Sequence, residues 1–311
     1  MNFPPAMIRR ALDWIDAKQQ RFGPSAFAVA VIKRNGDRRG SMFAALVTFY
    51  GLLSVFPLLL LFITFASMIL GANSEATKRL INAALADFPV IGDEIAKNIH
   101  ALAKGNAFAL IASALFLLWG ALGLTSALQT ASHQAWSRPR HEEPNILVRT
   151  LRGLSLLGVI GLSVVAATVL TGISQAGIFH TSPLVIRLLV LLGTAVVDLV
   201  AYYVAMRILS PKEVTGRQLI PGIMVGGLGW LALQNLGGYL IQHQLHRTTA
   251  IYGFFAIVLG LIFWLNLGAQ LFMYATQINV VRVNRAWPRG LFEPSDEVKA
   301  ELAENGQSFE N

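Results

Sequence analysis

Long runs without a charged side chain constrain this sequence more than any other feature. A helix that crosses the hydrocarbon core of a bilayer, about 30 Å thick, needs roughly 20 apolar residues. Runs without Asp, Glu, Lys or Arg exceed that length at residues 40–74, 105–137, 153–186, 218–246 and 248–281. A sixth run, 188–206, is equally apolar but contains Asp198 near its middle. We therefore expect an all-α polytopic membrane protein with six transmembrane helices in a membrane domain of residues 40–290.

The composition argues against an ordinary soluble protein. Of the 311 residues, 54% are hydrophobic and 14% are charged, whereas an average soluble domain has about 25% charged residues. The chain has no cysteine, which excludes disulfides, thiolate metal ligands and a cysteine nucleophile. The sequence also lacks a Gly-rich phosphate loop and a nucleophile motif. We expect no metal site, no cofactor and no enzymatic activity.

Lys and Arg are concentrated in alternate connecting segments. Eight lie in residues 1–39, four in 138–152, three in 207–217 and four in 282–311, whereas the three other loops together hold six. Because cytoplasmic loops carry the excess of Lys and Arg, we expect both termini in the cytoplasm. The net charge of +8 then reflects topology and attraction to anionic lipid headgroups. Membrane lipids are the expected partners and nucleic acid is not, while the sequence permits an oligomer without specifying one.

Two segments flank the membrane domain and one long loop interrupts it. Residues 1–39 have apolar positions at helical spacing, which predicts an amphipathic interfacial helix that Pro24 ends or kinks. A short apolar elbow is expected to follow at 26–32. The loop 72–104 is expected to form an external amphipathic helical hairpin. The tail, 291–311, is acidic and has little apolar periodicity, so it is expected to be disordered and cytoplasmic.

Asp198 is the strongest candidate for a functional residue. An acid in the middle of a membrane helix costs about 2.5–3.5 kcal/mol on insertion scales, and it usually faces a bundle interior or a water-filled pathway. No Lys or Arg lies inside any of the six runs. The partner of Asp198 must therefore be an arginine at a helix end, a neutral polar side chain or its own proton. Tyr202 lies one turn further along the same helix. A substrate or proton role and a structural hydrogen bond between helices both fit the sequence.

The sixth predicted helix has a line of polar residues. At 100° per residue, Asn266, Gln270 and Gln277 lie on one face, with Tyr252 at its edge. Amides within a membrane either hydrogen-bond helices to one another or line a cavity. Both alternatives fit this pattern.

Small and polar residues also alter the fifth and first predicted helices. Gly222 and Gly226 have the spacing of close helix packing, and Gln234 and Asn235 lie deep enough to need partners. Pro57 lies in the middle of the first run and removes a backbone hydrogen bond, which predicts a kink. The kink either serves packing or frees a carbonyl for a ligand.

Short motifs, and the order in which they follow one another along the six predicted helices, resemble the YihY/virulence factor BrkB family over about residues 35–290. The resemblance in the first helix rests on Ala44-Ala45-Leu46, Phe49-Tyr50, Leu53-Ser54 and Phe56-Pro57. In the last two helices it rests on Pro221-Gly222, Trp230, Tyr252-Gly253, Trp264-Leu265 and residues 274–281. Residues 234–240 and Trp287-Pro288-Arg289 are similar to the YhjD-type branch of the family.

The resemblance implies a multi-pass protein of the bacterial inner membrane with about six helices. Many members of the family have an acid near the end of the last helix, whereas this chain has Ala275-Thr276-Gln277. A proton-coupled role at that position is therefore not implied for this chain. The family's links to envelope lipids imply export or flipping of a lipid-linked molecule.

Three functions follow as hypotheses. The first is a transporter or flippase of a lipid-linked or envelope-related molecule, with a cavity among the first, fourth, fifth and sixth helices. The second is a structural or scaffold protein of the envelope, which would bury the same polar groups in closed contacts between helices. The third, a membrane-bound nuclease, follows from a ribonuclease label once attached to the family, and the sequence offers no motif for it.

The predicted topology can be tested directly because the chain has no cysteine. Asn98→Cys places a thiol in the predicted external hairpin, and Gln307→Cys places one in the predicted cytoplasmic tail. An impermeant thiol reagent applied to intact cells should label the first variant and not the second. Equal labelling of the two variants would contradict the arrangement.

Overall fold

The computed structural model describes residues 14, 16–54, 107–138, 145–175, 183–240 and 246–290. Every regular element in these ranges is a helix, which confirms the all-α prediction. The helices are α2 (Gly23–Asp37), a helix at Gly40–Ser54, α6 (Ala107–Ala135), α7 (Ile146–Gln175), α8 (Pro183–Leu209), α9 (Gly216–Leu240) and α10 (His246–Val283).

Four of the helices are long and apolar enough to cross a membrane. Their spans are Ile146–Ala167 in α7, Leu184–Leu209 in α8, Gly216–Leu236 in α9 and Val258–Val283 in α10. They correspond to the last four predicted runs. The second run contains α6, and Gly40–Ser54 begins the first. Residues 1–13, 55–106, which include Pro57 and the predicted hairpin, and the tail 291–311 lie outside the described residues, so the full count of six remains a prediction.

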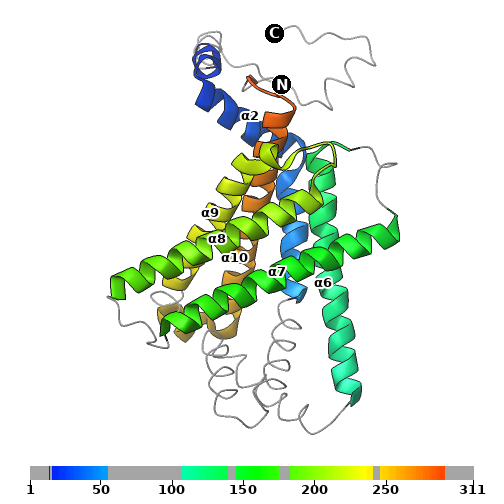
Figure 1. Cartoon of the computed structure of the whole chain (residues 1–311), viewed down its shortest axis with the longest axis vertical. Helices are drawn as coiled ribbons and strands as arrows, with labels where there is room; N and C mark the ends of the chain where they lie inside the picture. The colour runs from blue at the N-terminus through cyan, green and yellow to red at the C-terminus, as the bar shows by residue number, and fades with distance from the viewer. Residues whose placement is uncertain are drawn as a thin grey trace.

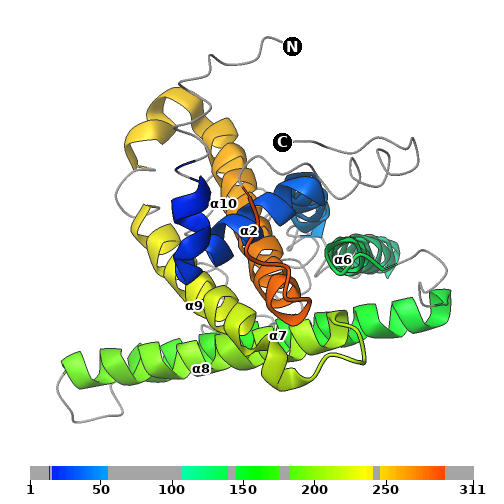
Figure 2. The ribbon, with the colours of Figure 1, turned by 90° about the horizontal axis from the view of Figure 1, so that it is seen from above.

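The helices form a bundle with an oblique pair on one side. In Figure 1, α6 and α10 run along the long axis, whereas α7 and α8 cross beside them at a steep angle. Seen from above, α9 and α10 lie side by side and α7 and α8 extend along one edge (Figure 2). Helix α2 packs on α10, at the end where α10 finishes.

Alanines make up a large part of the buried interior of the bundle, alongside a few large residues such as Met206, Leu219 and Met273, whereas many large apolar side chains lie outside. The main buried cluster includes Ala44, Ala127, Ala131, Ala135, Ala269 and Ala275. On α8, by contrast, Leu189 and Leu192 are more than half exposed. Lipid tails are as apolar as leucine, so membrane helices associate through close backbone packing and not by burying leucine. The distribution of side chains is that of a protein folded in a bilayer.

Gly222 marks the closest approach of α9 to α10. Its backbone N–H donates a hydrogen bond of 2.8 Å to Oδ1 of Asn279, which is fully buried. A Cβ on Gly222 would overlap the carbonyl oxygen of Ala275 and the side chain of Asn279. Pro221 lies immediately before, inside α9, and membrane helices tolerate such residues when neighbouring helices supply the missing hydrogen bonds.

Helix α2 packs against the C-terminal end of α10 and contacts the residues that follow it. Ala30 and Val31 form a buried cluster with Val281. Beyond α10, Arg289 pairs with Asp37 at 2.8 Å, and Lys33 donates a hydrogen bond of 2.7 Å to the Gly290 carbonyl.

The contacts of α2 correct one expectation from the sequence. Residues 26–32 were expected to form an elbow, whereas they lie inside α2, because Ala26 and Ala30 allow the helix to continue while it packs on α10. A helical segment at residues 16–21 ends just before Pro24, which lies in the first turn of α2. A break at Pro24 is what the sequence predicts.

The α9–α10 contact predicts that alanine destabilises the protein at Gly222 but not at Gly158. Gly222→Ala should lower the free energy of unfolding by about 1–3 kcal/mol, because the added methyl group must displace backbone. Gly158→Ala on α7 is the matched control, since no atom lies within 4 Å of its added Cβ. The control should be neutral or stabilising by up to about 1 kcal/mol through its higher helix propensity. Thermal melting in detergent measures both variants, and equal melting temperatures would contradict the contact.

Candidate functional site

Asp198 lies in the interior of the bundle, on α8 within the span Leu184–Leu209. The residue is only 5% exposed. The side chain of Gln234 on the neighbouring helix α9 lies close enough to hydrogen-bond to it. Of the three kinds of partner that the sequence permits, the structure has the neutral polar side chain. One oxygen of the carboxyl group, Oδ2, accepts no hydrogen bond from the described residues.

Tyr202 completes a cluster with Asp198 and Gln234. It lies one turn further along α8, is half-buried, and is close enough to Asp198 to experience its charge. Its ring covers the backbone of Gly226 on α9, where a Cβ would overlap the ring and lie 3.1 Å from the Cβ of Ala275 on α10. The cluster therefore lies where α8, α9 and α10 meet. A phenol, an amide and a carboxyl group can all take part in hydrogen bonds, and here the three lie near one another within the bundle.

Asn235 follows Gln234 in sequence but does not join this cluster. Its side chain is exposed, and its amide donates a hydrogen bond of 2.7 Å to the Leu231 carbonyl of the same helix. Successive residues of a helix differ by 100° in direction, so the two amides cannot face the same neighbour.

The polar line of α10 contacts a different part of the bundle. Asn266 donates a hydrogen bond of 3.3 Å to Thr48 Oγ1 in the helix at Gly40–Ser54. Gln277 is fully buried, and its amide makes no hydrogen bond to the described residues. Gln270 is half-buried, and the side chain of Tyr252 lies outside the described part. The sequence-predicted residues thus form two groups, one between α8 and α9 and one along α10.

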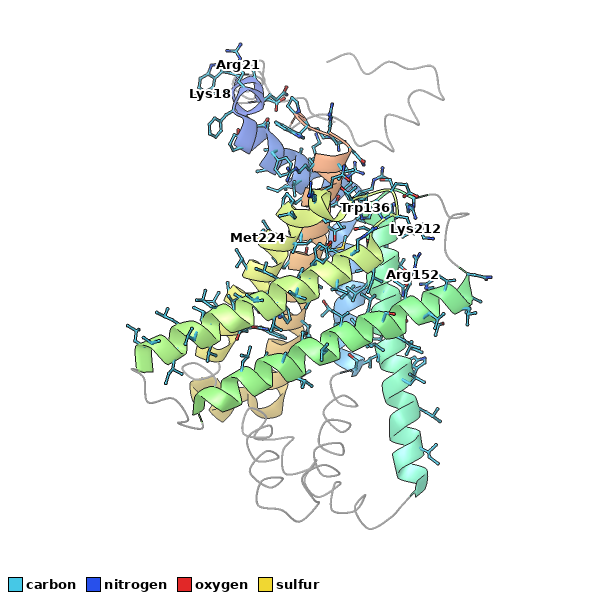
Figure 3. The ribbon with its side chains drawn as sticks, viewed as in Figure 1. Lys18, Arg21, Trp136, Arg152, Lys212 and Met224 are labelled. Carbon is cyan, nitrogen blue, oxygen red and sulfur yellow. The ribbon has the colours of Figure 1, made fainter. Side chains whose placement is uncertain are left out.

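Two adjoining cavities lie at the C-terminal end of α8. Both are lined by the first turns of α7 and the last residues of α8, and the first cavity also by the last turns of α6. They share Arg152 and Lys212. Figure 3 shows these two residues in the same half of the molecule as Lys18 and Arg21. Neither cavity is lined by Asp198, Tyr202 or Gln234. Among the described residues, no three His, Asp or Glu side chains gather as a metal ion would require.

Asn279 is the buried polar residue that the sequence analysis missed. It is 200° around α10 from Gln277, so it does not lie on the polar line. The signal in the sequence is the residue type itself, because an amide in an apolar membrane helix needs a hydrogen-bond partner. In the structure that partner is the backbone N–H of Gly222 on α9.

Comparisons with known proteins agree with the resemblance in the sequence. The model of the family described as virulence factor BrkB matches residues 31–299. An uncharacterised protein of Dickeya dadantii (strain 3937) is 27% identical over 178 residues, which are 51% of this chain and 54% of that protein. The match therefore spans about half the length of this relative. No solved structure matches the chain. Because the family model covers most of its length, the chain belongs to the virulence factor BrkB family.

Proposed function

We propose that the protein is a multi-pass transporter or flippase of the bacterial inner membrane that moves a lipid-linked or envelope-related molecule without altering it chemically. The observation that carries the proposal is Asp198, an acid buried in the middle of a membrane span. A buried acid without a cationic partner is expensive in a bilayer, and such residues usually mark a substrate or proton pathway.

The surroundings of Asp198 support this role. Its partner Gln234 is neutral, so a protonated and an ionised carboxyl group can both occupy the site without leaving an arginine or lysine unpaired. The free Oδ2 provides a position for a proton or a polar group of a substrate. A purely structural acid would be expected to use both oxygens in closed contacts between helices.

The packing of α8 against α9 allows the site to open. Gly226 and Gly227 hold the two helices together by backbone proximity to Tyr202 and Leu199, without a salt bridge between them in the described residues. Helices in such contact can separate by small shifts of packed side chains. In this proposal, α8 and its partner α7 move relative to α9 and α10, and both chain termini face the cytoplasm.

Asp198→Asn tests the proposal because the amide resembles the acid in shape and costs less to hold in hydrocarbon. We expect wild-type membrane abundance and a melting temperature in detergent within a few degrees of wild type (about 1 kcal/mol at most), but loss of function. Function is measured as the distribution of envelope lipids between the two leaflets, compared with a strain that lacks the protein.

The matched control is Asp16→Asn, the same chemical change on an acid outside the membrane spans, where Gln20 is the partner. It should preserve the wild-type lipid distribution. A lipid distribution that does not change on deletion of the gene would contradict transport altogether. A variant at Asp198 that is active but unstable would show that the acid is structural and support the scaffold alternative.

A further inference from the structure

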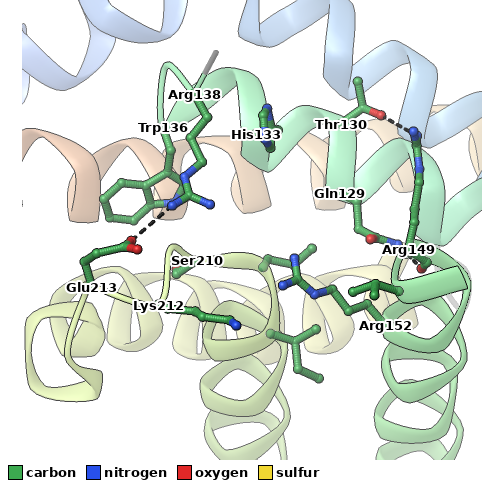
Figure 4. A pocket seen from close by; sticks show the side chains of 13 residues that line it. Gln129, Thr130, His133, Trp136, Arg138, Arg149, Arg152, Ser210, Lys212 and Glu213 are labelled. Atoms are coloured by element: carbon green, nitrogen blue, oxygen red, sulfur yellow. Dashed lines mark hydrogen bonds and ion pairs between the residues drawn. The ribbon is translucent and has the colours of Figure 1, made fainter. Parts of the chain in front are cut away.

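A basic cavity of about 330 Å³ lies between α6, α7 and the connection from α8 to α9 (Figure 4). Its charged lining consists of four cationic side chains and one carboxylate, namely Arg138, Arg149, Arg152, Lys212 and Glu213. Glu213 pairs with Arg138 at 3.0 Å. The lining therefore has an excess of positive charge.

Arg152 and Lys212 are the cations available to a ligand. Arg149 is held against α6, since it donates hydrogen bonds of 2.6 Å to Ser126 Oγ and 2.9 Å to Thr130 Oγ1. In the part of the chain that the structure describes, Arg152 and Lys212 make no hydrogen bond or ion pair. Their charged ends point toward one another across the cavity (Figure 4). Like charges that face each other repel, and an anion bound between them would convert the repulsion into attraction.

A buried donor adds to the site. Trp136 lines the cavity and is 8% exposed, and its indole N–H has no hydrogen-bond partner among the described residues. A buried N–H without a partner is costly. Guanidinium, ammonium and indole N–H groups donate hydrogen bonds and do not accept them. The one carboxylate of the lining, Glu213, is already paired with Arg138. A ligand rich in acceptor oxygens, such as a phosphate group, therefore suits the remaining donors.

The cavity continues toward the lipid-facing side of the bundle. The adjoining cavity shares Arg152 and Lys212 and is also lined by Leu151 and by Arg207. Leu147, Leu151 and Leu154 are exposed on the same helix, α7, within its membrane span. A ligand with its anionic group between Arg152 and Lys212 would thus have hydrocarbon surface beside it. This arrangement suits a lipid better than a soluble ion.

We propose that the cavity binds the phosphate group of an anionic phospholipid, with Arg152 and Lys212 as its cationic ligands and the exposed leucines of α7 in contact with the acyl chains. Basic pockets between membrane helices recognise anionic headgroups in this way. The proposal goes beyond transport, because a headgroup can be bound here whether or not the protein moves lipid. Arg152 and Lys212 belong to the connecting segments 138–152 and 207–217, for which the charge pattern predicts a cytoplasmic position.

The full-length protein in an uncharged detergent tests the proposal, with bound molecules counted by native mass spectrometry. The probes are dioleoyl phosphatidylglycerol, dioleoyl phosphatidylcholine and soluble glycerol 1-phosphate. The test variant combines Arg152→Gln with Lys212→Gln, and the control combines Arg217→Gln with Arg282→Gln. The control removes the same net charge from exposed positions that do not line the cavity. Lys212→Gln alone, at an exposed residue, is a second variant that should fold.

Wild-type protein should bind phosphatidylglycerol in preference to phosphatidylcholine, and the test variant should bind it about tenfold or more weakly. The control variant should retain wild-type binding. Equal losses in the test and control variants would assign the effect to general surface charge and overturn the site. Binding of glycerol 1-phosphate as tight as that of phosphatidylglycerol would overturn the lipid as the occupant. Because this assay measures binding alone, its result is independent of that for Asp198→Asn.

Discussion

The close approach of α9 to its two neighbours is the contact on which the rest of the bundle depends. In a bilayer no hydrophobic force draws helices together, so backbone proximity and interhelical hydrogen bonds must do so. Gly222 meets Ala275 and Asn279 of α10, and Gly226 and Gly227 meet Tyr202 and Leu199 of α8. A larger residue at Gly222 would meet the backbone of α10 and one at Gly226 the Tyr202 ring of α8, so either would push its neighbouring helix away from α9.

The buried acid is a consequence of this packing. Because α8 lies against the glycines of α9, Asp198 is enclosed beside Gln234 and shielded from lipid. A wider separation would expose the carboxyl group to hydrocarbon, where it would be more costly. The same glycines therefore bring the helices close together and lower the cost of holding Asp198 within the membrane. The lipid-facing side of α7 and α8 is apolar by contrast, and polar groups of these helices gather at the end that holds the basic cavity.

Hydrophobicity and helical period predicted most of the fold. The long charge-free runs located α7, α8, α9 and α10 because a membrane span has no substitute for apolar length. The prediction of an elbow at 26–32 was wrong. The small residues that pack α2 on α10 give no hydrophobic pattern from which the helix could be recognised in the sequence. In the same way, α7 begins at Ile146, so Arg149 and Arg152 lie in its first turns and not in a loop.

The site was predictable only in part. Asp198 and Gln234 could be identified as buried polar groups in apolar runs, but their pairing depends on how α8 and α9 are rotated about their axes. The angular pattern on α10 predicted that Asn266, Gln270 and Gln277 share one face, but it could not show that Asn266 faces Thr48 and not Asp198. The basic cavity is formed by residues 129–138, 148–152 and 208–213. The third segment lies far from the other two in the sequence, so no local spacing of residues predicts the cavity.

Disulfide cross-linking between α8 and α9 tests the central contact most directly. A Cβ on Gly227 would lie 3.2 Å from the Leu199 Cα, and its other close contacts are with the Leu199 side chain, which the substitution removes. The two backbones are therefore near enough for the short bridge of a disulfide, and the chain has no other cysteine. The double variant Leu199→Cys with Gly227→Cys should therefore form an intramolecular disulfide on mild oxidation in membranes. Val200→Cys with Gly227→Cys, in which residue 200 is exposed on the outer side of α8, should not. Failure of the first pair to cross-link, or equal cross-linking of both pairs, would contradict the packing of α8 on α9 that encloses Asp198.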